Sequence, residues 1–348
     1  MSLFRNPLRD LEQYRELENR ISKAEGPAVV TGLPDAAKAH LVSELCGADR
    51  PWKLLVTYDD ARAREMCDDL RAFSDQVWMY PARDLLFYSA DIRGFEVSKA
   101  RIDVWRRMQE EEGGFVVTTV DALMDQLEEP DRFKKSVFRI DEADSVDLQK
   151  LSEKLVEFGY ERTAEVDGIG QFSIRGGIID FFPVTEELPV RIELWDTDID
   201  SIRSFDPESQ RSVENLTGVT VYPAKEETLG GSASFLRYWD YSKTVLFLDE
   251  PLRLGERARN VEEEFRSSMA ARLETGQITR EEMPELFSAE EILKELETGI
   301  SVCLSGLDSR IPDFESRFSC SLEAKSAASY PGSFELLLCG KTESGAND

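Results

Sequence analysis

The sequence is poor in histidine and in cysteine. Its 348 residues include one histidine, His40, and five cysteines, which are Cys46, Cys67, Cys303, Cys320 and Cys339. The cysteines are scattered and form no C-x-x-C pair, so they predict neither a disulfide framework nor a structural zinc site. A mechanism built on a Ser-His or Cys-His couple has a single imidazole to use. These absences exclude most hydrolase templates, and we expect no metal site and no cofactor.

Long apolar runs and an excess of positive charge are also absent. No apolar run approaches the roughly 20 residues that cross a bilayer, and the opening MSLFRNPLRDLEQYRE lacks the apolar core of a signal peptide. We therefore expect a cytoplasmic protein. The formal charge is −27, from 42 lysines and arginines against 69 aspartates and glutamates. Such a surface repels phosphate backbones, so the chain at large should not bind nucleic acid, although a local basic patch would still be compatible with the charge.

The length predicts two or three domains, because single hydrophobic cores stop growing at about 250–300 residues. In the first third of the chain, short apolar runs alternate with segments of helical spacing, an order typical of a parallel α/β layer. The runs are AVVTG (28–32), KLLVTY (53–58), QVWMYP (76–81) and FVVTTV (115–120).

The middle of the chain follows a different pattern. After the helical segment 147–160, two stretches of alternating residues, GQFSIRGGIIDFFP (170–183) and VRIELWDTDIDSIRSFD (190–206), predict an antiparallel meander. Gly176 and Gly177 fit a bulge or a close backbone approach. These features predict a small α+β domain.

The α/β character returns beyond about residue 220. The extended segments there are TVLFLDE (244–250), ISVCLSG (300–306) and FELLLC (334–339). We therefore expect an α/β parallel-sheet domain that is interrupted by a small α+β insert domain. The three expected parts are residues 1–130, 131–220 and 221–348.

A degenerate nucleotide-binding loop lies at TGLPDAAKA (31–39), between a predicted strand and a predicted helix. Against the pattern G-x-x-x-x-G-K-[ST] it keeps Gly32 and Lys38, but Ala37 replaces the second glycine and Ala39 replaces the hydroxyl residue that binds Mg²⁺. A Cβ at residue 37 disfavours the backbone geometry that points N–H groups at phosphate, and a methyl group cannot ligate a metal. The loop favours a non-catalytic fold over a working ATPase.

Two acidic motifs could complete a nucleotide site. The letters DEAD (141–144) follow a charged strand, and a side chain of residues 144–147 can cap the next helix, so we interpret this match as accidental. Asp249 and Glu250 are better placed, because they follow an apolar strand. Pro251 and the altered loop indicate that they are a relic, and we assign no catalytic residue.

Arginines and one tryptophan recur along the predicted meander, at Arg162, Arg175, Arg191 and Trp195. One interpretation is structural: the arginines balance neighbouring acids such as Glu161, Asp180 and Glu193. The other is recognition, because arginine and tryptophan are enriched at binding hot spots. A sheet face with arginines around an aromatic side chain would suit an acidic partner.

The segment GQFSIRGGIIDFFPVTEELPVRIELWDTDIDSIRSFDPESQRS (170–212) resembles the UvrB-like N-terminal module of the bacterial transcription-repair coupling factor (Mfd) family, and more loosely UvrB itself. Stretches on either side agree in order, and the resemblance covers roughly residues 1–340. These stretches are YPARDLLFYSADIRGFEVSKARIDVWRRM (80–108), FVVTTVDALMDQL (115–127) and DLQKLSEKLVEFGYER (147–162).

The resemblance implies a partner and a set of binding residues. In that family the small middle domain docks onto the damage-recognition ATPase UvrA, and the matching positions are Arg162, Arg175 and Arg191, with Trp195 where the family usually has phenylalanine. The resemblance also implies that the parallel-sheet domain is a degenerate RecA/P-loop-like domain, as in UvrB, and that it has lost its nucleotide-binding loop. UvrB's tyrosine-rich hairpin, which clamps DNA, has no room between Tyr80 and Arg101.

Full-length members of the family continue into a domain that binds RNA polymerase and an ATP-dependent translocase on double-stranded DNA, so we expect this chain to be an N-terminal fragment. The resemblance further implies that the UvrA surface is masked in the whole protein until the motor engages. The leading hypothesis is a non-catalytic adaptor that recruits UvrA to stalled RNA polymerase for nucleotide excision repair. The alternatives are a residual P-loop ATPase or helicase-like domain that acts on damaged DNA and uses Lys38, Asp249 and Glu250, and direct binding of damaged DNA without hydrolysis.

Overall fold

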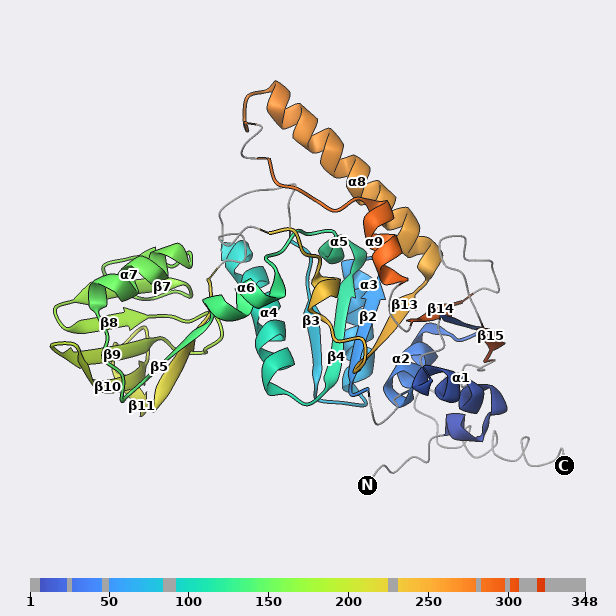
Figure 1. The fold of residues 1–348 in the computed structure, drawn as a ribbon, viewed down its shortest axis with the longest axis horizontal. Helices are drawn as coiled ribbons and strands as arrows, with labels where there is room; N and C mark the ends of the chain where they lie inside the picture. Colours follow the sequence, from blue (N-terminus) through green and yellow to red (C-terminus); the bar gives the residue numbers. More distant parts are fainter. Residues whose placement is uncertain are drawn as a thin grey trace, which may run out of the picture.

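A large parallel sheet and a smaller, mostly antiparallel sheet organise the chain (Figure 1). The computed structural model describes residues 7–23, 27–45, 50–83, 92–224, 231–279, 283–297, 301–306 and 318–322. The segment FELLLC (334–339), expected to be extended, lies outside these residues. No helix among the described residues is long and apolar enough to cross a membrane.

The large sheet has seven strands in the order β15-β1-β14-β13-β2-β4-β3, and every neighbouring pair is parallel. The strands are β1 (Ala28–Thr31), β2 (Trp52–Thr57), β3 (Val77–Tyr80), β4 (Gly114–Thr119), β13 (Thr244–Asp249), β14 (Ser301–Ser305) and β15 (Phe318–Ser321). Strands from the first and last parts of the chain interleave, because β1 lies between β15 and β14. The expected fold class, a parallel α/β domain interrupted by a small insert, is confirmed.

Helices cover both faces of this sheet, so its strands are apolar on both sides. In β2, Leu54 and Val56 belong to one hydrophobic cluster and Leu55 to the other. One cluster includes residues of α4 (Ile92–Glu110), α5 (Val120–Leu123), α8 (Pro251–Glu274) and α9 (Ala289–Leu296). The other includes residues of α1 (Glu12–Ser22), α2 (Asp35–Glu44) and α3 (Asp60–Arg71).

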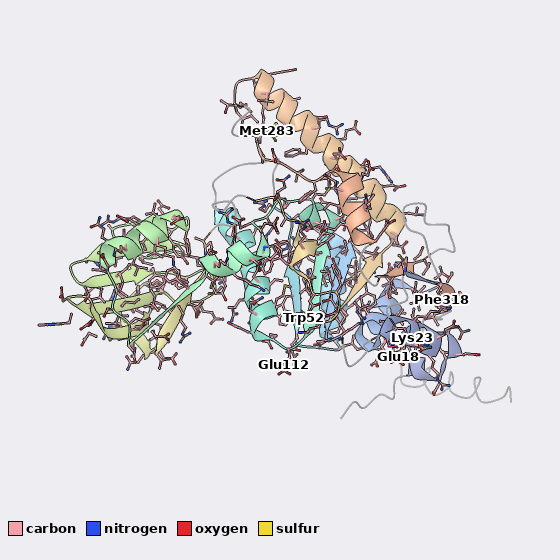
Figure 2. The ribbon with its side chains drawn as sticks, in the orientation of Figure 1. Glu18, Lys23, Trp52, Glu112, Met283 and Phe318 are labelled. Carbon is pink, nitrogen blue, oxygen red and sulfur yellow. The ribbon has the colours of Figure 1, made fainter. Side chains whose placement is uncertain are left out.

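The far end of α8 projects beyond the body of the large sheet (Figure 1). Met283 lies beside that end (Figure 2) and lines an apolar groove with Met269 and Leu273 of the helix. The remaining helical segments are η1 (Pro7–Asp10), α6 (Pro130–Ser136), α7 (Leu148–Glu157) and η3 (Phe235–Tyr238).

The smaller sheet has six strands in the order β11-β10-β9-β8-β7-β6, and only the β6–β7 pair is parallel. The strands are β6 (Glu161–Arg162), β7 (Gln171–Arg175), β8 (Ile178–Phe181), β9 (Val190–Trp195), β10 (Asp198–Phe205) and β11 (Ser212–Asn215). Two further strands pair with each other: β5 (Phe138–Asp141), near the start of the middle part of the chain, and β12 (Gly218–Val221), near its end. The expected meander is present; the boundaries at residues 130 and 220 stay a prediction.

The glycine pair of the meander forms the turn between β7 and β8. Gly176 has φ +62°, in the left-handed region, and Arg175 pairs with Ile178 across the turn. A Cβ on Gly177 would lie 2.9 Å from the carbonyl oxygen of Leu194. The close backbone approach is therefore present at Gly177. The shifts of register in the meander lie elsewhere, between Ile199 and Ser201 and between Ser204 and Phe205.

The described cysteines, Cys67, Cys303 and Cys320, are free thiols and all are buried. Burial raises the pKa of Cys67 and of Cys303 to about 12, so these thiols are protonated at neutral pH. Among the residues that the structure describes, no group of three or more histidine, cysteine, aspartate or glutamate side chains is arranged to hold a metal ion.

Candidate functional site

The two faces of the six-stranded sheet differ sharply in character. Ile179 pairs with Ile174 and Ile192, and this apolar row packs in one hydrophobic cluster with Leu151 and Leu155 of α7. Because side chains alternate along strands, the next row points to the opposite side. We call that side the outer face; its charged and aromatic residues on the six strands are Glu161, Arg175, Asp180, Arg191, Glu193, Trp195, Asp198, Arg203 and Phe205.

Asp180 lies at the centre of the outer face and accepts hydrogen bonds from two arginines. Its Oδ1 is 2.7 Å from Nε of Arg191, and its Oδ2 is 2.9 Å from Nη2 of the same residue. Oδ2 is also 2.8 Å from Nη2 of Arg175. The side chain of Asp180 is 1% exposed, whereas those of Arg191 and Arg175 are 16% and 51% exposed. Arg175 and Arg191 therefore balance the charge of Asp180, as the structural interpretation predicts. Arg175 nevertheless presents half of its side chain to solvent.

Several contacts fix the side chain of Arg191. Its guanidinium lies 4.5 Å from the ring centroid of Phe205, which packs in a small cluster with Val166 and Phe182. Its Nη2 also donates to Oε1 of Gln210 at 3.1 Å, and Nη1 donates to the Gln210 carbonyl at 3.4 Å. The hydrogen bond to Asp180 raises the pKa of Arg191 further above its ordinary value, although partial burial opposes this. Arg191 is a fixed positive charge.

Trp195 ends β9, immediately before a turn in which Asp196 has φ +61°. Its side chain is 83% exposed, the largest value among the exposed large hydrophobic side chains of the described residues. On the same face, Glu193 forms an ion pair with Arg203, a contact that sequence reasoning missed because it depends on the register of β9 against β10. The outer face thus brings an exposed indole together with three arginines and four carboxylates, since Asp198 pairs with Trp195 and Glu161 pairs with Gln171 on the same side.

Arg162 lies apart from the other sites predicted along the meander. It is exposed on the edge strand β6, in register with Phe172 of β7, and Phe172 belongs to the apolar row on the α7 side. Neighbours in register share a face, so Arg162 does not project from the outer face. The structure brings together Arg175, Arg191 and Trp195.

The residues of the altered loop converge with the acidic pair after β13. Gly32 follows β1 with φ +82°, Ala37 is half-buried, and Ala39 is completely buried in the core. Lys38 has no exposed surface, and its Nζ lies 2.8 Å from Oδ1 of Asp249 and 2.7 Å from Oε1 of Glu250.

Asp35 and Arg62 add further ion pairs to this cluster. Nζ of Lys38 also lies 3.1 Å from Oδ1 of Asp35, and Nε of Arg62 donates to Oδ2 of Asp249 at 2.7 Å. Burial disfavours the charge on Lys38, yet Asp249 and Glu250 raise its pKa above the ordinary value. The lysine that would contact a phosphate in a working loop is therefore bound to three carboxylates of its own chain.

The DEAD letters lie away from this cluster. Asp141 ends β5, which pairs with β12 in a separate two-stranded sheet. The backbone N–H of Asp141 donates to Asp144, and Asp147 caps α7 by accepting from the N–H groups of Gln149 and Lys150. These letters do not lie on the parallel sheet, which agrees with their interpretation as accidental.

A cavity of about 360 Å³ lies where β2 and β4 of the parallel sheet end, a place where α/β folds commonly bind ligands. Its arginines are paired with carboxylates: Nη2 of Arg257 lies 2.6 Å from Oδ2 of Asp121, and Nε of Arg83 lies 3.2 Å from Oδ2 of Asp125. Asp59, Asp60 and Glu264 add further acids to the lining. This excess of carboxylates does not suit a polyphosphate.

Comparisons with known proteins place the outer face in a recognised domain. Residues 138–226 match the family model of the UvrB interaction domain. The chain is 34% identical over 221 residues to the transcription-repair-coupling factor of Bacillus subtilis (strain 168). The aligned residues are 63% of this chain and 19% of the relative. It is 30% identical over 228 residues to the protein of the same name from Staphylococcus aureus (strain bovine RF122 / ET3-1). The aligned residues are 65% of this chain and 19% of that relative.

The chain therefore spans about a fifth of the length of the curated relatives that it matches. The resemblance to transcription-repair coupling factors, first seen in residues 170–212, is confirmed.

Proposed function

We propose that this chain is a non-catalytic adaptor module of a transcription-repair coupling factor, and that its outer face binds UvrA to recruit it to stalled RNA polymerase for nucleotide excision repair. The observation that carries the proposal is Trp195, which is 83% exposed on the same face as Arg175, within the segment that matches the UvrB interaction domain. An indole left in water gains free energy when a partner covers it. In a full-length coupling factor, we assign contacts with RNA polymerase and double-stranded DNA to other parts of the protein.

The composition of the outer face supports an acidic partner surface. The whole chain carries a formal charge of −27, whereas on the outer face three arginines nearly balance four carboxylates. A nearly balanced face with the half-exposed guanidinium of Arg175 repels an acidic partner less than the rest of this acidic chain does. Tryptophan and arginine are also the side chains that dominate binding energy when they are covered.

Replacing Trp195 by alanine should weaken binding to UvrA by about 10- to 30-fold, the usual effect of truncating one aromatic hot spot. The test is a titration of purified UvrA with the chain, by calorimetry or interferometry. Val156→Ala is a matched control, since Val156 is a 57% exposed apolar residue of α7, on the other side of the sheet. Both substitutions should leave Tm nearly unchanged. Equal affinity of the Trp195→Ala variant and the unchanged chain would rule out the proposed surface.

The non-catalytic part of the proposal is supported by the contacts of Lys38. Its ammonium group is bound to Asp35, Asp249 and Glu250, so phosphate would have to displace carboxylates that are already in place. We expect no measurable ATP turnover by the purified chain and no change of Tm when Mg·ATP is added. Turnover that disappears in a Lys38→Ala variant would instead favour the residual ATPase.

A further inference from the structure

Asp180 is the one acid of the outer face that is almost completely buried, and both of its oxygens accept from arginines. We infer that Asp180 is a positioning residue for partner binding: it holds Arg175 and Arg191 in the arrangement that an acidic partner meets. This inference rests on the proposed function of the outer face, and it assigns different roles to the two arginines.

The first step of the argument is the geometry of the shared oxygen. Oδ2 of Asp180 accepts from Nη2 of Arg191 at 2.9 Å and from Nη2 of Arg175 at 2.8 Å. Two guanidinium groups this close would repel each other without the carboxylate between them. Asp180 therefore determines how near Arg175 lies to the fixed charge of Arg191.

The second step separates direct contact from background charge. Arg191 is 16% exposed and is occupied by Asp180, Gln210 and the ring of Phe205, so few of its donors can reach a partner. Arg175 is 51% exposed and donates one N–H bond to Asp180. A guanidinium tethered at one end keeps its other donors for a partner, and its orientation is already fixed before binding.

The third step gives the chemistry of the partner. The partner should place a carboxylate against the free edge of Arg175 and an apolar recess over Trp195, which lies two strands away from Arg175 on the same face. Arg191 then strengthens the attraction without a direct hydrogen bond. Because Arg175 is the residue through which Asp180 acts, the effect of removing Asp180 should depend on Arg175.

The sign of the effect of Asp180→Asn distinguishes positioning from simple charge. Removing a negative charge from a face that meets an acidic partner should tighten binding if only the net charge matters. Releasing Arg175 from its tether should weaken binding, because the partner must then order a long, mobile side chain. We expect the second effect to be larger and the affinity of Asp180→Asn for UvrA to fall by about tenfold.

The experiment is a double-mutant cycle in the full chain, with purified UvrA as the probe and Tm measured for every variant. Asp180→Asn should weaken binding about tenfold in the unchanged background but less than about threefold when Arg175 is already alanine. Glu193→Gln, which removes an acid from the same face, is the control and should change affinity less than about threefold. Asp180→Glu keeps the charge but moves it outward, and it should also weaken binding; this variant decides the question if Asp180→Asn does not fold.

The outcomes separate the inference from the proposed function. If Trp195→Ala and Arg175→Ala both bind UvrA as tightly as the unchanged chain, the proposed surface is wrong, and the role of Asp180 is wrong with it. If those variants bind weakly but Asp180→Asn binds equally or more tightly, only the inference is overturned. It is also overturned if Asp180→Asn weakens binding equally with and without Arg175.

Discussion

The combined variant Arg175→Glu and Trp195→Ala is expected to bind UvrA about a thousandfold more weakly than the unchanged chain. Trp195 is 83% exposed, so truncation removes a large apolar contact from the partner but little packing from the free chain. Reversing the charge at residue 175 adds repulsion of an acidic partner to the loss of an arginine contact. Each change should contribute roughly 2 kcal/mol to the loss of affinity.

A control pair of the same chemistry lies on the large-sheet domain. Arg64 of α3 has a 71% exposed side chain, and Phe73, which follows the helix, is 49% exposed. The variant Arg64→Glu with Phe73→Ala carries the same change of charge and also removes an exposed aromatic ring, although a smaller one, and it should bind UvrA with unchanged affinity. Equilibrium titrations of the two double variants at one ionic strength make the comparison, with Tm as a check on folding. Equal loss of affinity in both would show that net charge, rather than the outer face, governs binding.

Hydrophobic patterning predicted six of the seven strands of the parallel sheet, and it missed the edge strand β15 (Phe318–Ser321). Runs such as KLLVTY and TVLFLDE are apolar at consecutive positions, which suits a strand that is covered on both faces, and Leu54, Leu55 and Val56 indeed divide between two clusters. The meander was equally readable, because residues 170–206 alternate between apolar and polar side chains. Periodicity of this kind is local, so one sequence is enough to reveal it.

The detail of the site depends on contacts that are distant along the chain. Asp180 could be named as a neighbour of the arginines, but its simultaneous bonds to Arg175 and Arg191 follow from the registers of β8 with β7 and β9. Arg162 is a second residue whose position could not be predicted without the strand register. Its spacing suggests membership of the arginine group, yet its pairing with Phe172 directs it to the other side of the sheet. Packing and turn geometry together determine the register of the strands, and the amino-acid sequence specifies that register only indirectly.

The ionic cluster beneath the altered loop illustrates a second kind of contact that sequence reasoning missed. Lys38, Asp249 and Glu250 were predicted to be remnants of a nucleotide site, but Arg62 was not singled out, because a helical arginine is usually a solvated residue. In the structure Arg62 is 4% exposed and bonds to Asp249, Asp35 and Glu65. A buried acid needs partners, so the burial of Asp249 next to Lys38 is the signal that a second cation lies nearby.

Replacing Lys38 by alanine should lower the free energy of unfolding by about 3–5 kcal/mol, the typical cost of breaking a buried ion pair. The substitution leaves Asp249, which has no exposed surface, with Arg62 as its remaining cation, and it brings Asp249 and Glu250 together without the ammonium group between them. Denaturant titration followed by tryptophan fluorescence measures the change. Lys150→Ala, an 82% exposed lysine paired with Asp147 at 3.8 Å, is the control and should cost less than about 0.5 kcal/mol.

Stability and binding should separate in this variant, because residue 38 lies on the large-sheet domain and the outer face lies on the six-stranded sheet. At a temperature where Lys38→Ala is still folded, its affinity for UvrA should equal that of the unchanged chain. A loop lysine kept for phosphate would behave differently: its removal would relieve a strained, partly unsatisfied charge and would cost little stability. A loss below about 1 kcal/mol would therefore contradict a structural role for Lys38, since that is the range of an exposed ion pair.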